Sequence, residues 1–340
     1  MGAVPSVEDV LRRVAMFSGR VVTHRRLEGG LSHQIWVVNC GGRSYVLRVL
    51  DPAVSAAGLG ISPAQEITNT LRAAESGVGA RVYEVLPEIP ALVLEYLPGR
   101  TLSAADVRQP ATILRIAEAC RRLHAGPRFG NEFSIVVKLH ELLAICRRHE
   151  LRVPDGYVER LSTVEDISSA LDANPLPTKP CHNDLLAENF VDSGGTIRIV
   201  DYQLAGNNDP SFELGNIAAE ADFEPDRAEA LSATYFGAEH TPALAARVRL
   251  NLVLSNVTWT LWFSVHHGLL RNTDASFDYA GEASDKWNRA VHDLDSPEFG
   301  RLLDTAAGRS PARPHAAADP SLPSAPAAPP PVAHSQGGLQ

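Results

Sequence analysis

The sequence predicts an α+β fold with two lobes, a small antiparallel β lobe followed by a larger, mainly helical lobe. Three observations support this prediction. The chain has 340 residues, more than one typical domain. Strand-like runs dominate between residues 21 and 50, whereas helical periodicity dominates after about residue 100. A cluster of polar residues then interrupts a stretch of apolar and small residues in "PCHNDLLAENF", at 180–190.

The composition allows a sizeable core and argues against one class of partner. Hydrophobic residues make up 44% of the chain and charged residues 21%, with a formal net charge of -9. Affinity for nucleic acid depends on clustered Lys and Arg, which this sequence does not show, so no nucleic-acid partner is expected. The four cysteines lie far apart without metal-ligand spacing, and we expect reduced thiols in the core.

We expect a cytoplasmic protein with no membrane partner. Residues 1–20 are interrupted by charges and contain no apolar run typical of a signal peptide. The match of "MGAVPS" to a myristoylation pattern is too short to outweigh chance. The run at 250–270 carries no Asp, Glu, Lys or Arg and is long enough to suggest a membrane span. Its several Asn, His, Ser and Thr residues favour a buried core helix instead.

The first lobe is expected to span residues 1–96. Gly41 and Gly42 separate two strand-like runs in "IWVVNCGGRSYVLRVL", and glycine supplies the positive φ angles that a tight hairpin needs. The remaining elements expected from the pattern are a helix at about 64–76, strands at 80–86 and 91–97, and a linker, "LPGRTL", at 97–102.

The second lobe is expected to span residues 97–305. Apolar residues in "ATILRIAEACRRLH", at 111–124, recur at helical spacing, and helices are expected again from about 210 to 309. The last segment, 306–340, is rich in Pro and Ala and almost lacks large apolar side chains. Such a segment cannot offset the entropy lost on ordering, so we expect a disordered, dispensable tail.

The polar cluster has the spacing of a kinase catalytic loop. His182 and Asp184, with Asn189 five residues after the Asp, match H-R-D-x-x-x-x-N, in which the Asp receives the acceptor proton and the Asn holds magnesium. Asp201 follows a strand, a Gly-Gly turn and a second strand, where a kinase places its other metal-binding carboxylate. Mg²⁺ prefers oxygen ligands, so Asn189 and Asp201 are assigned to the metal and Asp184 to catalysis. The alternative, ordinary turn and strand-end residues, is disfavoured by their joint occurrence after a β-rich lobe.

On these motifs, residues 27–303 resemble the choline/ethanolamine kinase and aminoglycoside phosphotransferase superfamily. "FELGNIAAE", at 212–220, is similar to a signature of the choline-kinase branch, and "FDYAGEASDKWNRAV", at 277–291, is similar to the end of its bacterial members. The resemblance implies a bilobal protein-kinase-like fold, ATP and Mg²⁺ as cofactors, and a role for His182 in bracing the catalytic loop. The chain lacks the GxGxxG, DFG and APE segments of a protein kinase.

The nucleotide site is indicated by a glycine-containing segment and by one cation. In "LEGGLSHQIWVV", missing side chains would let backbone amides approach phosphates, although a plain hairpin turn is the alternative. The candidate residues of this segment are Gly29, Gly30 and Ser32. "LVLEYLPG" resembles the kinase hinge, where adenine would meet the backbone of Glu95, Tyr96 and Leu97.

A kinase also needs a cation on the following strand, and the first lobe contains no lysine. Arg48 in "YVLRVL" is at the matching position, and a guanidinium can grip phosphate oxygens as a fork. Glu66 on the predicted helix would be its ion-pair partner. The alternative is that Arg48 is a surface residue of an alternating strand.

A narrow stripe of the helix expected at 250–270 contains two tryptophans among hydrogen-bonding groups. In choline kinases, which this chain resembles, aromatic walls and a carboxylate hold a quaternary ammonium group, and cation–π attraction gives the physical reason. We assign Trp259 and Trp262 to the walls and Glu220 or Asp222 to the counter-charge. The alternative is that both tryptophans only pack the large lobe.

The predicted function is Mg²⁺-dependent transfer of the γ-phosphoryl group of ATP to the hydroxyl of a small molecule, and the expected acceptor is a cationic amino alcohol such as choline or ethanolamine. An aminoglycoside-type antibiotic phosphotransferase is one alternative. A catalytically silent nucleotide-binding protein on the same fold is another, because Arg48 replaces the usual lysine and the glycine segment is short.

Overall fold

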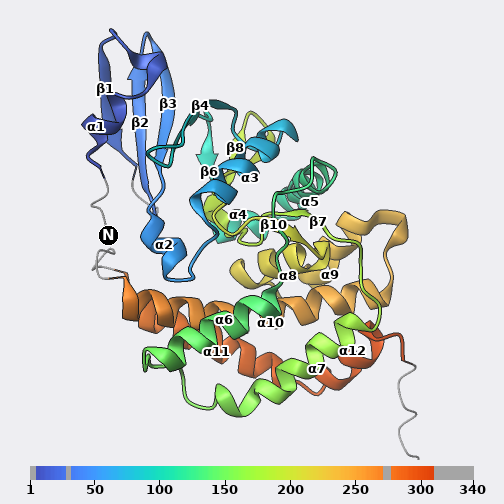
Figure 1. Ribbon diagram of the computed structural model, residues 1–340. Helices are drawn as coiled ribbons and strands as arrows, with labels where there is room; N and C mark the ends of the chain where they lie inside the picture. Colours follow the sequence, from blue (N-terminus) through green and yellow to red (C-terminus); the bar gives the residue numbers. More distant parts are fainter. Residues whose placement is uncertain (1–4, 28–31, 271–276, 310–340) are drawn as a thin grey trace, which may run out of the picture.

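The computed structural model describes residues 5–27, 32–270 and 277–309. A five-stranded antiparallel sheet lies near the start of the chain, and helices dominate the rest (Figure 1), as the α+β prediction requires. The strand order is β1-β2-β3-β5-β4. These strands are β1 (Val22–Arg26), β2 (Gln34–Cys40), β3 (Arg43–Val49), β4 (Val82–Leu86) and β5 (Ala91–Glu95).

The predicted hairpin is confirmed between β2 and β3. Gly41 and Gly42 have φ angles of 57° and 76°, the left-handed conformation that such a two-residue turn needs. Alternate residues of the two strands, among them Val38 and Leu47, then point into one small core. Helix α1 (Val7–Leu11) supplies Val10 to the same core.

The predicted helix of the first lobe is also confirmed, as α3 (Pro63–Glu75). It begins at Ser62, whose hydroxyl accepts the amide of Gln65 while the Gln65 side chain accepts the amide of Ser62. This reciprocal arrangement satisfies two amides that have no partner within the helix. A short helix that the sequence analysis did not predict, α2 (Pro52–Ala56), connects β3 to α3.

The second lobe is mainly helical. Its α-helices are α4 (Ala104–Val107), α5 (Pro110–His124), α6 (Ile135–Arg148), α7 (Leu161–Asp172), α8 (Pro210–Glu220), α9 (Pro225–Phe236), α10 (Pro242–Leu269), α11 (Tyr279–Leu294) and α12 (Phe299–Ala306). The 3-10 turns there are η2 (Val158–Arg160), η3 (Ala187–Asn189) and η4 (Gly237–Glu239). Its short strands are β6 (Arg100–Thr101), β7 (Lys179–Cys181), β8 (Phe190–Ser193), β9 (Thr196–Ile199) and β10 (Gly206–Asn208).

Helix α10 is the central element of this lobe, with α6, α8, α11 and α12 packed around it (Figure 1). It is buried along most of its length, which explains why residues 250–269 include no Asp, Glu, Lys or Arg. The expectation of a core helix at 250–270 is therefore confirmed. Among the helices that the structure describes, none is long and apolar enough to cross a membrane.

Two boundaries differ from the sequence-based expectation. The segment 97–102 is not only a linker, because β6 lies within it and pairs with β8, with Thr101 opposite Val191. Backbone hydrogen bonding to a distant strand leaves little trace in a two-residue sequence. The expected tail at 306–340 begins too early, since Ala306 is the last residue of α12, and residues 310–340 lie outside the described part of the chain.

Candidate active site

Three of the predicted site residues lie together. Asp184 follows β7, Asn189 ends η3, and Asp201 follows the hairpin of β8 and β9. All three line one cavity of about 480 Å³. The spacing that suggested a catalytic loop is thus accompanied by convergence of the side chains in space.

Two residues of this region have an uncommon backbone conformation, one in the loop that carries Asp184 and one at the predicted metal site. Asn183 and Asp201 have φ angles of 69° and 71°, a region that non-glycine residues seldom adopt and that is often found at functional sites. The Asn183 side chain stabilises its own turn by donating to the carbonyl of Leu204 at 3.0 Å. The Asn189 Nδ2 donates to the carbonyl of Asp184 at 2.8 Å, which leaves its Oδ1 as the atom that could bind a metal.

Asp184 is a carboxyl group in an environment that disfavours its charge. Burial, followed by the nearby negative charges of Glu220 and Asp201, raises the pKa of Asp184 well above its usual range. Such a shift strengthens the basicity of a carboxylate. Asp184 is therefore suited to receive a proton from a hydroxyl group.

His182 braces this loop, as the resemblance implied. Its Nε2 donates to the carbonyl of Val200 at 2.8 Å, and its Nδ1 accepts the amide of Asp184 at 3.2 Å. Burial lowers the pKa of His182, which keeps the ring neutral and preserves this pattern of donor and acceptor. Both ring nitrogens therefore form hydrogen bonds to backbone groups. Because one of these groups is the Asp184 amide, His182 positions Asp184.

Glu213 of α8 is a second brace, which the sequence analysis missed. Its two carboxylate oxygens accept the amides of His182 and Asn183 at 2.8 and 2.7 Å, and the residue is fully buried. Burial alone would raise the pKa of Glu213, but a hydrogen bond from His124 and the neighbouring histidines lower it overall. Glu213 lies within "FELGNIAAE", a segment that was noted only for its resemblance to a family signature.

His124, Cys181 and Glu213 form a group whose potential metal-ligand atoms lie within 4.8 Å of one another. The group is buried beneath the loop, and the carboxylate oxygens of Glu213 already accept the two loop amides. Its contacts therefore serve to hold the loop on α8.

Arg48 makes the expected ion pair and a further one. Its Nε donates to Glu66 Oε1 at 2.8 Å, and its two terminal nitrogens donate to the two carboxylate oxygens of Asp201. Arg48 is only 5% exposed, which contradicts the alternative of a surface strand residue. The guanidinium thus connects β3, α3 and the metal-binding candidate Asp201 in one charge-assisted network.

This network keeps both carboxylates ionised. Burial acts to raise the pKa of Glu66 and of Asp201, but the Arg48 guanidinium and the neighbouring His33 together outweigh it and hold both pKa values below their usual range. The Asp201 side chain retains 27% exposure, against 6% for that of Arg48, so its carboxylate keeps an open side. Oxygen donors from Asn189 and Asp201 in one cavity fit the preference of Mg²⁺.

The nucleotide-binding candidates divide into three groups. Gly29 and Gly30 lie outside the described residues. Ser32 lines the cavity, and its hydroxyl accepts Gln203 Nε2 at 3.2 Å. The hinge candidates do not line the cavity as far as the structure describes it, and the Glu95 amide already donates to the carbonyl of Arg81 at 2.8 Å. The Glu95 amide is thus unable to donate to adenine at the same time, and the adenine contacts of Tyr96 and Leu97 stay predictions.

The two tryptophans predicted to form aromatic walls lie at the cavity. Trp259 and Trp262 of α10 line the cavity that contains Asp184, together with Phe263 and Phe277. The two tryptophans also belong to the core of the lobe, so the core-packing alternative is partly right. Trp262 Nε1 donates to the carbonyl of Leu59 at 3.0 Å, whereas Trp259 Nε1 has no hydrogen-bond partner within the described part of the chain.

The two predicted counter-charges differ. Glu220 lines the cavity, but its Oε1 is paired with Lys286 Nζ at 2.8 Å. The structure places Asp222 elsewhere: its side chain is 59% exposed, its nearest ion-pair partner is Arg289 at 3.8 Å, and it is absent from the described lining of the cavity. Glu220 is the last residue of α8, whereas Asp222 lies two residues further on with a φ of 53°, where the chain turns away from the helix.

Helix α11 contributes two lining residues that the sequence analysis missed, Glu282 and Lys286. They are one turn apart on the same helix. Their spacing of four residues in "FDYAGEASDKWNRAV" could have indicated that both side chains lie on one helix face. Nothing in the sequence indicates that this helix face meets Glu220, because the contact depends on how α11 packs against α10.

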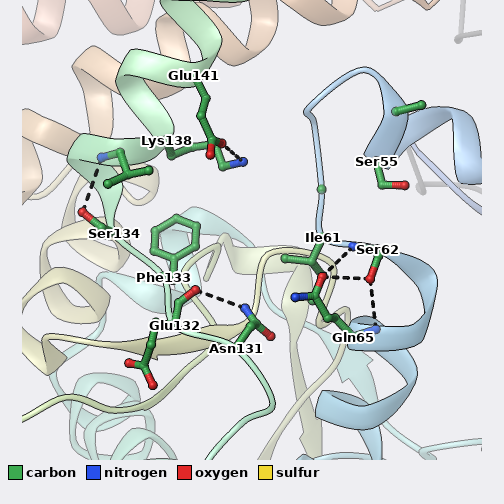
Figure 2. Close-up of a pocket in the computed structure, with 13 residues that line it drawn as sticks. Ser55, Ile61, Ser62, Gln65, Asn131, Glu132, Phe133, Ser134, Lys138 and Glu141 are labelled. Atoms are coloured by element: carbon green, nitrogen blue, oxygen red, sulfur yellow. Dashed lines mark hydrogen bonds and ion pairs between the residues drawn. The ribbon is translucent and has the colours of Figure 1, made fainter.

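A second cavity, of about 460 Å³, lies between the beginnings of α3 and α6 (Figure 2). Its lining includes the helix-capping residues Ser62 and Ser134 and the surface ion pair between Lys138 and Glu141, at 2.7 Å. None of the predicted site residues lines it within the described chain. The cavity around Asp184 is therefore the candidate active site.

The chain is similar to known proteins. Residues 23–250, more than half of the chain, match the model of a family described as the phosphotransferase enzyme family. Among curated proteins, LicA of Haemophilus influenzae is 25% identical over 270 residues, covering 73% of this chain and 77% of that protein. Choline/ethanolamine kinase of Rattus norvegicus is 28% identical over 160 residues, covering 42% and 39%.

A solved structure is similar over nearly its whole length. The choline/ethanolamine kinase family protein from Mesorhizobium loti is 30% identical, with a TM-score of 0.76, and the match covers 88% of this chain and 97% of that one. The protein-kinase-like fold predicted from the sequence is thereby confirmed.

Proposed function

Because the chain belongs to the phosphotransferase enzyme family, with choline/ethanolamine kinases among its relatives, we propose that it transfers the γ-phosphoryl group of ATP to the hydroxyl of a small, positively charged amino alcohol. One observation carries this proposal. Asp184 and Asn189 of the catalytic loop line the same cavity as Trp259 and Trp262. Groups suited to phosphoryl transfer and to ammonium binding therefore share one site.

The proposed reaction is a direct, in-line transfer. The acceptor oxygen forms a bond to the γ-phosphorus while the bond from that phosphorus to the β–γ bridging oxygen breaks, and ADP leaves. Asp184 orients the acceptor hydroxyl and takes its proton. His182 and Glu213 keep Asp184 in position through the loop backbone.

The nucleotide is assigned to the side of the cavity next to the sheet. Arg48 would hold the α- and β-phosphates, with Glu66 fixing its orientation. Asn189 and Asp201 would hold Mg²⁺, which when bound neutralises charge on the phosphates. The remaining nucleotide contacts are proposed for Gly29, Gly30 and Ser32, and for the carbonyl of Glu95 and the backbone of Tyr96 and Leu97.

The acceptor is assigned to the opposite side, against α10 and α11. Trp259 and Trp262 would attract an ammonium group through their ring faces. That a relative is named a choline/ethanolamine kinase supports the same class of acceptor.

The proposal is tested by ADP release from Mg-ATP in the presence of choline, ethanolamine, their methylated intermediates and aminoglycosides. We expect turnover with an amino alcohol. Turnover with aminoglycosides alone would show an antibiotic phosphotransferase instead. Tight Mg-ATP binding without turnover of any acceptor would favour the catalytically silent alternative.

Asp184→Ala tests the catalytic assignment. We expect kcat to fall by about 10²- to 10⁴-fold, because a positioned base contributes a factor of that size, while the dissociation constant of Mg-ATP changes little. Asp285→Ala removes an exposed carboxylate from α11 and should leave kcat unchanged. Turnover retained in Asp184→Ala would contradict the assignment.

A further inference from the structure

Lys286 is a buried amine in the acceptor part of the cavity, and the proposed reaction gives it no role. Its side chain is 5% exposed, and it lines the cavity that contains Asp184 and Trp259. The chain has only three lysines, and the other two, Lys138 and Lys179, do not line this cavity within the described residues. A buried lysine beside a reactive site calls for an explanation, because lysines are seldom buried unless they are paired.

The contacts of Lys286 are those that an ammonium ligand would make. Its Nζ lies 2.8 Å from Glu220 Oε1 and 6.0 Å from the centroid of the Phe263 ring. A carboxylate together with an aromatic face is the combination by which proteins bind organic cations. Glu220 and Phe263 are therefore already engaged by a cation that belongs to the protein.

The other charges of the cavity are distributed unevenly. Five carboxylates line the described part of the cavity. Asp201 is paired with Arg48 and Glu220 with Lys286, Asp184 and Glu188 lie on the catalytic-loop segment, and Glu282 lies on α11. Glu282 lies one turn before Lys286 on α11, lines the same cavity and is exposed. An acceptor cation next to Lys286 would be repelled at short range, whereas one near Glu282 would be attracted.

Building on the proposed function, we propose that Lys286 is a specificity-determining residue. It serves as the internal partner of Glu220, directs the positive group of the acceptor toward Trp259, Trp262 and Glu282, and disfavours acceptors that carry several positive charges. The site thus takes a small acceptor with a single positive charge. This assignment replaces Glu220 by Glu282 as the counter-charge of the acceptor.

The test is binding of tetramethylammonium, a non-reacting cation, to the full-length protein by isothermal titration calorimetry. Lys286→Met keeps the length and apolar stem of the side chain but removes its charge, and we expect it to bind the cation about tenfold more tightly. Lys286→Arg keeps the charge, so its affinity should stay within about twofold of wild type. Binding of the uncharged analogue 3,3-dimethyl-1-butanol should be the same in wild type and Lys286→Met.

Two further measurements complete the test. An aminoglycoside, which carries several positive charges, should gain more affinity than tetramethylammonium in Lys286→Met. Glu282→Gln keeps the size of an exposed side chain and removes its charge, and we expect it to weaken tetramethylammonium binding about fivefold. An unchanged affinity in either Lys286→Met or Glu282→Gln would overturn the proposal, and the Glu282 variant decides the matter if Lys286→Met does not fold.

The same experiment separates this inference from the proposed function. If wild type turns over no acceptor but tetramethylammonium binding follows the expected pattern, the role of Lys286 stands and the kinase proposal fails. If wild type phosphorylates an amino alcohol but charge removal at Lys286 leaves cation binding unchanged, the kinase proposal stands and the role of Lys286 fails.

Discussion

At the scale of single residues, Arg48 does what a lysine at this position could do only in part. One guanidinium donates through Nε to Glu66 and through both terminal nitrogens to Asp201. A lysine ammonium is a single point donor, so it cannot maintain this side-on contact with one carboxylate and a fork on another. Replacement of the usual kinase lysine therefore preserves the ion pair and adds a link to Asp201.

We expect Arg48→Lys to weaken Mg-ATP binding about tenfold, which corresponds to about 1.4 kcal/mol, because one charge-assisted hydrogen bond contributes about that much. The dissociation constant measured by calorimetry checks this. Arg43→Lys, an exposed position on the same strand, is the matched control and should bind Mg-ATP as wild type does. Equal affinities in all three proteins would show that Arg48 does not contact the nucleotide.

Among the elements, helix α8 holds the loop that carries Asp184. Glu213 on this helix holds the catalytic loop, Asn216 Oδ1 accepts the amide of Leu185 at 2.6 Å, and Glu220 reaches the acceptor cavity. The position of α8 is set by close packing on α10. At Gly215, an added Cβ would lie 2.7 Å from backbone and side-chain atoms of Asn251.

We expect Gly215→Ala to lower the free energy of unfolding by about 1–3 kcal/mol, because the overlap is with atoms of a helix that cannot move aside freely. A shift of α8 would also displace the loop held by Glu213, so kcat should fall. Gly300→Ala in α12 is the matched control, since an added Cβ there meets no atom within 4 Å. Urea unfolding and turnover check both expectations, and equal effects of the two variants would contradict this account of α8.

At the scale of the whole molecule, the helix α3 that follows the first strands is fastened to the second lobe. Asn69, which is fully buried, donates to Asn131 Oδ1 at 2.8 Å and to the carbonyl of Ala205 at 2.9 Å. Its Oδ1 accepts the amide of Gly130 at 2.9 Å. Since α3 also carries Glu66, these bonds hold the Arg48 network against the catalytic loop.

We expect Asn69→Ala to lower the free energy of unfolding by about 1–3 kcal/mol, because it removes the three hydrogen bonds by which a fully buried side chain joins Asn131, Ala205 and Gly130. Mg-ATP affinity should fall as well, because α3 becomes less firmly placed. Asn39→Ala, at an exposed position of β2, should change stability by less than about 0.5 kcal/mol. Thermal and urea unfolding measure the difference, and a silent Asn69→Ala would show that the lobes are held together elsewhere.

Much of the fold could be predicted because it depends on local patterns. The Gly41-Gly42 turn, the helix at 64–76 and the core helix at 250–270 each follow from turn chemistry or periodicity within one segment. Strand β6 could not be predicted in this way, since two residues carry no period and their partner strand lies some ninety positions away in the chain.

The residues of the candidate site could also be predicted only where they belong to a local sequence pattern. The spacing of Asp184 and Asn189 in the chain, followed by Asp201, identified the proposed catalytic and metal-binding groups, and the structure brings them into one cavity. The same approach offered Asp222 as a counter-charge, and the structure places it on the surface.

By itself, the sequence determined the fold class, the catalytic-loop motif and the aromatic stripe of α10, because each is encoded by residues close together in the chain. Only the tertiary structure decided that Glu213 holds the loop, that Glu220 is paired with Lys286, and that Glu282 faces the cavity. The physical reason is that these contacts join different helices. Their geometry depends on how α8 and α11 pack against α10, and no spacing within a single segment specifies that packing.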